Sequence, residues 1–188
     1  MRRRRKSAIP FDKDHYLQHH VLDANGDALV RIQLDNLQQV FSAFSPPQYE
    51  ELNEALASHI DAVVYPIPLR YQLILEFQIK GSSFQQQERV KQVIRDFYCL
   101  RCADKLQDLR INIIKIVALF SIGALLLTAS YHLASNGQGQ LITDFMNIAG
   151  TFALWEMVGL FLLEQQDIQL DKKNAEQTAR AIIRFSLD

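Results

Sequence analysis

Two long apolar segments dominate the hydrophobic pattern of the chain. Residues 111–133 read INIIKIVALFSIGALLLTASYHL, and residues 141–163 read LITDFMNIAGTFALWEMVGLFLL. A helix that crosses a bilayer needs about 20 mainly apolar residues, and each segment has that length. The residues between them, ASNGQGQ at 134–140, are small and polar, which is typical of a turn. The pattern therefore predicts two transmembrane helices joined by an external turn, a helical hairpin.

The Lys and Arg residues indicate how this hairpin is oriented. Fifteen of the twenty precede residue 111, four follow residue 163, and the turn has none. Cytoplasmic flanks of membrane helices carry the excess of Lys and Arg. We therefore expect both termini to be cytoplasmic and the turn to face outward, most simply in a bacterial inner membrane.

A small α+β domain is predicted ahead of the hairpin, over residues 15–110. Residues 16–22 and 28–34 flank the pair Asn25-Gly26, which is a strong signal for a β-hairpin. Residues 45–60 have a Ser-Pro-Pro start, early acidic residues and apolar positions at helical spacing, so a helix is expected there. Residues 70–80 (RYQLILEFQIK) alternate between apolar and polar positions, as a half-buried strand does.

A long helix is predicted to connect this domain to the first apolar segment. Ser83 and Gln86 have the spacing of a capping box, and no Gly or Pro follows before residue 111. We therefore expect one uninterrupted helix from residue 83 into the membrane.

The segment after the hairpin, residues 164–188, is expected to be cytoplasmic. Residues 164–180 are polar and lack Gly and Pro, which favours a helical extension. Residues 181–187 (AIIRFSL) fit either a strand added to the domain's sheet or an amphipathic helix on the membrane surface, and we favour the strand. The predicted fold is thus an α+β membrane protein, a cytoplasmic β-β-α-β-α domain on a two-helix transmembrane hairpin.

Two charges lie inside the predicted spans. Lys115 and Glu156 are about equally far from the turn, so they lie at the same depth. A charge in the hydrocarbon is costly and usually faces a partner. We therefore predict that they pair, within one hairpin or between neighbouring hairpins. The alternatives are that Glu156 lines a pore or carries protons, or that Lys115 snorkels to the surface and leaves Glu156 alone.

Small residues predict where the two helices meet. Equal distance from the turn places Gly123 opposite Gly150, and Ser121 opposite Thr151. Because small residues let membrane helices approach closely, this set is the expected helix–helix seam.

The basic start of the chain is a candidate for lipid binding. Arg2, Arg3, Arg4 and Arg5 open a tail over residues 1–14 that lacks the apolar core of a signal peptide. Such clusters bind anionic headgroups on the cytoplasmic leaflet. The alternative is a flexible tail that only sets topology.

No pattern in the chain predicts catalysis or a cofactor. Cys99 and Cys102 have Cys-x-x-Cys spacing, but there is no second pair and no strand directly before them, so packing on a helix is expected, with lipid modification or metal binding as the alternatives. His15, His19 and His20 lack the ligand spacing of a known metal site. HExxH, GxSxG and P-loop motifs are absent from the sequence, so we expect neither an enzyme nor a metal or cofactor.

Two functional classes are compatible with these features. The first is a membrane-anchored interaction, assembly or sensing protein, whose cytoplasmic domain binds an unidentified protein. The second is an oligomeric channel or membrane-perturbing effector whose hairpins line a pore. Both involve the bilayer and a homo-oligomer. The net charge of −1 argues against nucleic acid as a partner.

Overall fold

The computed structural model describes residues 22–23, 26–46, 49–79, 83–135 and 139–186. The chain divides into two compact units, which we describe separately. The first contains the residues up to Tyr98 and those from Glu176 onward, and the second is Cys99–Ala175. The 52-residue helix α3, Phe84–Ser135, supplies residues 84–98 to the first unit and residues 99–135 to the second.

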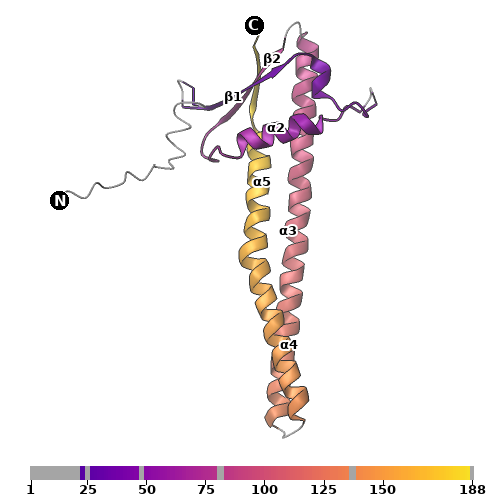
Figure 1. Ribbon diagram of the computed structural model, residues 1–188, viewed down its shortest axis with the longest axis vertical. Coiled ribbons are helices and arrows are strands. Elements are labelled where there is room, and N and C mark those ends of the chain that lie inside the picture. The colour runs from indigo at the N-terminus through magenta and orange to yellow at the C-terminus, as the bar shows by residue number, and fades with distance from the viewer. Residues whose placement is uncertain (1–21, 24–25, 47–48, 80–82, 136–138, 187–188) are drawn as a thin grey trace, which may run out of the picture. The chain divides into compact units, whose positions relative to one another are not determined.

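The first unit is built on a three-stranded parallel sheet (Figure 1). Its order is β1-β2-β3, with β1 at Ala28–Leu34, β2 at Leu73–Ile79 and β3 at Ile182–Ser186. The 3-10 helix η1 (Leu37–Val40) and the helix α2 (Glu54–Val64) connect β1 to β2. The expected α+β class is therefore confirmed.

One face of this sheet forms the core of the unit. The strand register aligns Val30 with Leu75 and Ile183, and Ile32 with Phe77 and Phe185. Phe77 and Phe185 stack with their ring centroids 5.8 Å apart. Helices α2 and α3 contribute further buried side chains, namely Leu56, Ile60, Val64, Val90, Ile94 and Tyr98. On the other face, Arg31 pairs with Glu76 at 2.9 Å, and Glu76 is in register with the exposed Arg184.

The C-terminal segment forms a strand, as favoured from its alternating pattern. β3 pairs in parallel with β2, from Ile74–Ile182 to Gln78–Ser186. Parallel neighbours need a crossover connection, which is usually a single helix. Here the connection contains the whole helical second unit.

The predicted start of the helix at residues 45–60 was wrong. Helix α2 begins at Glu54 instead of Ser45, because the Asn53 side chain caps it by accepting a hydrogen bond from Ala55 N at 2.9 Å. An antiparallel bridge between Phe41 and Leu52 closes the preceding residues into a loop. In that loop the Ser45 hydroxyl donates to the Ser42 carbonyl at 2.8 Å. The Phe41–Leu52 pairing and the Asn53 cap thus override the Ser-Pro-Pro signal.

Two other local predictions can be compared with the structure. Ser83 and Gln86 form the capping box, with Gln86 Oε1 accepting from Ser83 N at 2.9 Å and Ser83 Oγ accepting from Gln86 N at 3.4 Å. Most of the expected strand at 16–22 lies outside the described residues. Its last residue, Leu22, makes an antiparallel bridge with Ala28.

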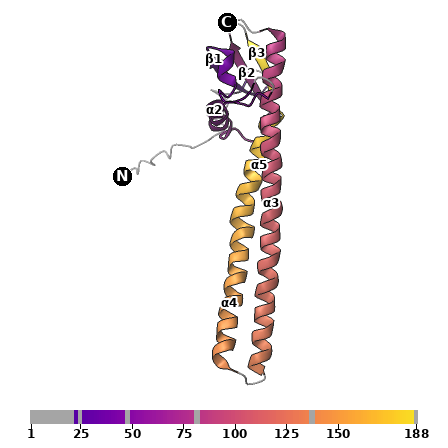
Figure 2. The same ribbon diagram turned by 90° about the vertical axis from the view of Figure 1, so that its right-hand side faces the viewer.

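The second unit consists of two helices that run side by side in both views (Figures 1 and 2). After α3, the chain continues through α4 (Gln140–Gly159), the π-helical turn η2 (Leu160–Glu164) and α5 (Gln165–Ala179), which belongs to this unit up to Ala175. Both helices are long and apolar enough to cross a bilayer, by length and composition. α3 runs without interruption through residue 111, as the absence of Gly and Pro predicts.

Candidate functional site

The candidate site is the seam between the two helices of the second unit. One set of less exposed residues on α3 recurs at alternating steps of three and four. This set is Cys102, Lys105, Leu109, Asn112, Ile116, Leu119, Gly123, Leu126 and Ser130, and near the turn it is flanked by the half-buried Ala124, Leu127, Ala129 and Leu133. A repeat of 3.5 residues is typical of helices that coil around each other, so the seam has the geometry of an antiparallel coiled coil.

Two glycines bring the helix backbones together. A Cβ atom on Gly123 would lie 3.1 Å from the Gly150 carbonyl oxygen and 2.8 Å from Leu154 Cδ2. A Cβ atom on Gly150 would lie 3.1 Å from the Gly123 carbonyl oxygen and 2.9 Å from Leu127 Cγ. Both positions therefore favour glycine, because a side chain would press on the facing backbone and on a leucine of the other helix.

The other two residues of the predicted seam are placed differently. Ser121 and Thr151 are exposed, and each hydroxyl donates at 2.8 Å to a carbonyl four residues earlier in its own helix. The structure thus brings Gly123 and Gly150 together but leaves Ser121 and Thr151 on the outer surface.

Polar side chains join the helices at points that the sequence analysis did not identify. Ser130 Oγ donates to the Thr143 carbonyl at 3.0 Å, and Asn112 Nδ2 donates to the Leu160 carbonyl at 3.4 Å. Asn112 is fully buried, and its Oδ1 has no hydrogen-bond partner among the described residues. Both are polar residues at inward positions of the 3.5-residue repeat, so they become recognisable once the phase of that repeat is known.

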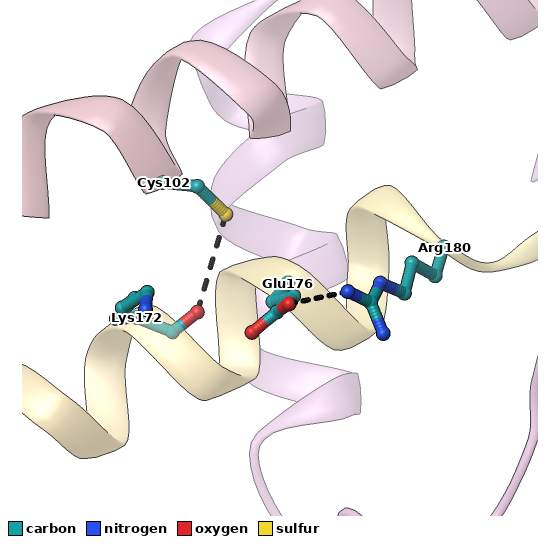
Figure 3. A network of polar contacts seen from close by, with 4 residues as sticks. All are labelled: Cys102, Lys172, Glu176 and Arg180. Carbon is teal, nitrogen blue, oxygen red and sulfur yellow. Dashed lines mark hydrogen bonds and ion pairs between the residues drawn. The ribbon is translucent and has the colours of Figure 1, made fainter. Parts of the chain in front are cut away.

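The seam continues beyond the apolar segments with polar contacts. Lys105 Nζ lies 3.2 Å from Asp171 Oδ2. The Cys102 thiol points at the Lys172 carbonyl across the seam, at 4.0 Å (Figure 3). The same figure shows an ion pair in the first unit, between Arg180 and Glu176 at 2.6 Å.

The π-helical turn η2 changes which residues face the seam. Before it, the less exposed positions include Thr143, Met146, Gly150, Ala153, Met157 and Leu160; after it, they include Gln165, Ile168, Lys172 and Ala175. A π-turn inserts one extra residue into an α-helix. Without that residue, the repeat would turn Glu164, Asp167 and Asp171 toward α3, whereas all three are exposed. The inward residues of α4 and those of α5 are thus offset by one residue in sequence, and the extra residue in η2 lets both sets face α3.

The two charges inside the apolar segments are on the outer surface. Lys115 and Glu156 are both exposed, and the described residues include no ion pair between them. Exposed apolar side chains lie close to them in sequence, including Ile111 and Ile114 on α3 and Phe152 and Trp155 on α4. Their pairing stays a prediction.

A shallow groove of about 440 Å³ also lies on the outer surface of α4. It is lined by Asn147, Ile148, Thr151, Phe152 and Trp155. Because all five belong to one helix, the groove is a gap between neighbouring side chains and not a formed cavity.

The first unit has a polar cleft of about 510 Å³. Its lining includes Tyr49, Glu50, Arg89 and Asp96. Arg89 pairs with Glu50 at 2.7 Å. Nearby, the buried Tyr98 hydroxyl donates to Asp61 Oδ1 at 3.0 Å, which ties α3 to α2. These pairings join α3 to α2 and to the residues that precede it.

The remaining candidate residues do not form a site in the part of the chain that the structure describes. Cys99 is exposed, and neither it nor Cys102 is in a disulfide. No cluster of His, Cys, Asp and Glu suited to a metal ion occurs among the described residues. Arg2, Arg3, Arg4, Arg5 and the three early histidines lie outside the described residues.

Comparisons with known proteins leave the function to be inferred from these residues. No protein-family model, curated protein or solved structure matches the chain.

Proposed function

We propose that this protein is a membrane-anchored interaction or assembly protein without catalytic activity. The helical hairpin holds it in the bilayer, and the α+β unit binds a protein partner in the cytoplasm. Both termini are cytoplasmic in this proposal, and a bacterial inner membrane is the most natural location.

The main support for a membrane anchor is the apolar outer surface of the hairpin. Its large exposed side chains run from Ile111 to Leu163 and include Phe120, Leu125, Phe145, Phe152 and Trp155. Contiguous exposed apolar patches of more than a few hundred Å² mark interaction or membrane surfaces. Only a narrow seam of the hairpin is covered by the helices themselves, so an apolar surrounding is the simplest way to cover the rest.

The distribution of charges supports the proposed orientation. The apolar stretch gives way to polar residues at both cytoplasmic helix ends, where Lys105 and Asp171 form an ion pair. Lys and Arg are concentrated at those ends and absent from residues 134–140.

Carbonate extraction and thiol labelling test the anchor and its orientation together. The full chain should stay with the membrane pellet at high pH. In intact cells, a membrane-impermeant maleimide should label a Gln140→Cys variant that carries Ser at positions 99 and 102. The native Cys99 should be labelled only after lysis. Release by carbonate would refute the anchor, and the reverse labelling pattern would refute the orientation.

A second candidate is an oligomeric channel. Lys115 and Glu156 favour it, because both are exposed on an otherwise apolar surface where several hairpins could gather around them. A Glu156→Gln variant that keeps its assembly but changes ion flux through proteoliposomes would support a pore. Unchanged flux with altered assembly would support the anchor.

A further inference from the structure

We propose that a second copy of the chain docks on one edge of the hairpin, with Lys115 of each copy against Glu156 of the other. The resulting dimer is a four-helix bundle. This inference rests on the proposed membrane anchor and names the partner of its hairpin.

The seam between the two helices has an edge on each side, and its geometry places Lys115 and Glu156 on the same edge. Lys115 directly precedes the inward residue Ile116, and Glu156 directly precedes the inward residue Met157. In an antiparallel pair of helices with a 3.5-residue repeat, positions that precede such inward residues lie on the same side of the seam. Because the two charges are also equally far from the turn, they lie at one level along one edge.

The charged edge carries two small residues. On the opposite edge, Leu127 and Leu154 pack against the two seam glycines. On the charged edge, Ala129 and Ala149 directly precede inward residues, as the two charges do. The exposed Ile122 lies between Lys115 and Ala129 on this edge. Small residues allow helices to approach closely, so a second hairpin can reach this edge.

A two-fold axis along the bilayer normal satisfies both charges at once. Rotation about such an axis brings α3 of one copy against α4 of the other, without changing depth or orientation in the bilayer. Each Lys115 then meets a Glu156 at its own level, and an isologous contact gives two such pairs. A chain that carries both charges is thus complementary to itself.

Cross-linking between distinguishable chains tests the contact. Two differently tagged full-length chains, both with Ser at positions 99 and 102, would be co-expressed, one with Lys115→Cys and the other with Glu156→Cys. Mild oxidation in membranes should yield the doubly tagged product. The matched control pair, Ile113→Cys with Val158→Cys, has the same depth but lies on the opposite edge, and we expect at least tenfold less product.

Charge variants provide a readout that does not depend on introduced cysteines. In nanodiscs, the wild-type particle should contain two chains. Lys115→Glu should lower the dimer fraction about tenfold at limiting protein density, and adding Glu156→Lys should restore it. One chain per particle in the wild type, equal cross-linking at the control positions, or no rescue by the swap would overturn the dimer. Carbonate extraction of the same samples reports separately on the anchor.

Discussion

The two units of the chain use large apolar side chains in opposite ways. In the first unit, which we call the sheet unit, Ile74, Leu75 and Phe77 are fully buried. In the hairpin, Ile114, Phe152 and Trp155 are 68%, 66% and 74% exposed. One unit encloses its large apolar residues in a core, whereas the other covers only a narrow seam and leaves most of its large apolar residues on the outside. The contrast shows that hydrophobic content alone does not distinguish the units, whereas the side on which those residues lie does.

Truncation of one Phe in each unit should give the largest difference in stability between variants of the two units. Phe77→Ala removes a fully buried ring from β2, and we expect the free energy of unfolding of the sheet unit to fall by about 3–5 kcal/mol. Phe152→Ala removes an exposed ring and should leave the sheet unit unchanged. Amide hydrogen exchange, followed by mass spectrometry, reads both units in one sample. Equal loss of protection in β2 from both variants would contradict the distinction.

A side chain at the glycine contact should have the next largest effect. Gly123→Val pushes a branched side chain against the Gly150 carbonyl and Leu154, so overpacking should cost about 1–3 kcal/mol. Gly159→Ala is the matched control in the same hairpin, because its Cβ would have nothing within 4 Å. Since Gly weakens a helix interior, that control should stabilise the hairpin by about 0.5–1 kcal/mol. Unfolding in mixed micelles measures both, and equal stabilities would refute the close contact.

Deletion of one residue from the π-turn should have the smallest effect. Removing Leu162 converts η2 into regular α-helix and keeps both sets of inward residues against α3. We expect the free energy of unfolding of the hairpin to change by less than about 1 kcal/mol. Surface changes usually have effects of this size, and a regular helix adds only a small gain. Insertion of one Ala after Leu162 is the control, because it turns the acidic residues of α5 toward the seam. If deletion is as damaging as insertion, η2 does not have the register function assigned to it.

Local signals explain which parts of the structure could be predicted. Length and apolar content identify the two long helices, and the alternating pattern identifies β2 and β3. The Ser83 cap is set by neighbours within one turn, so it too can be read from the sequence. The start of α2 was misplaced because two local signals compete, the Ser-Pro-Pro sequence and the Asn53 cap, and the Phe41–Leu52 bridge selects the second. The parallel pairing of the strands joins segments that are distant in sequence, so no local signal predicts it.

Within the hairpin, the level of a residue along the helix axes could be predicted, but the side that it faces could not. Equal distance from the turn gives the same level for Gly123 and Gly150 and also for Ser121 and Thr151. Only the phase of the 3.5-residue repeat decides which residues face inward, and it places the glycines in the seam and the hydroxyl residues outside. The π-turn was missed because one extra residue in an otherwise helical pattern leaves no local signal. Asn112 and Ser130 become recognisable only once that phase is known.

The crossover between β2 and β3 has a consequence for the order of events during synthesis. About a hundred residues separate these adjacent strands, a very long loop to close for one sheet contact. Because a ribosome makes the chain from its N-terminus, both long helices emerge before β3 does. The sheet therefore stays one strand short until the helices have left the ribosome, and its completion marks a nascent chain whose hairpin has already been made.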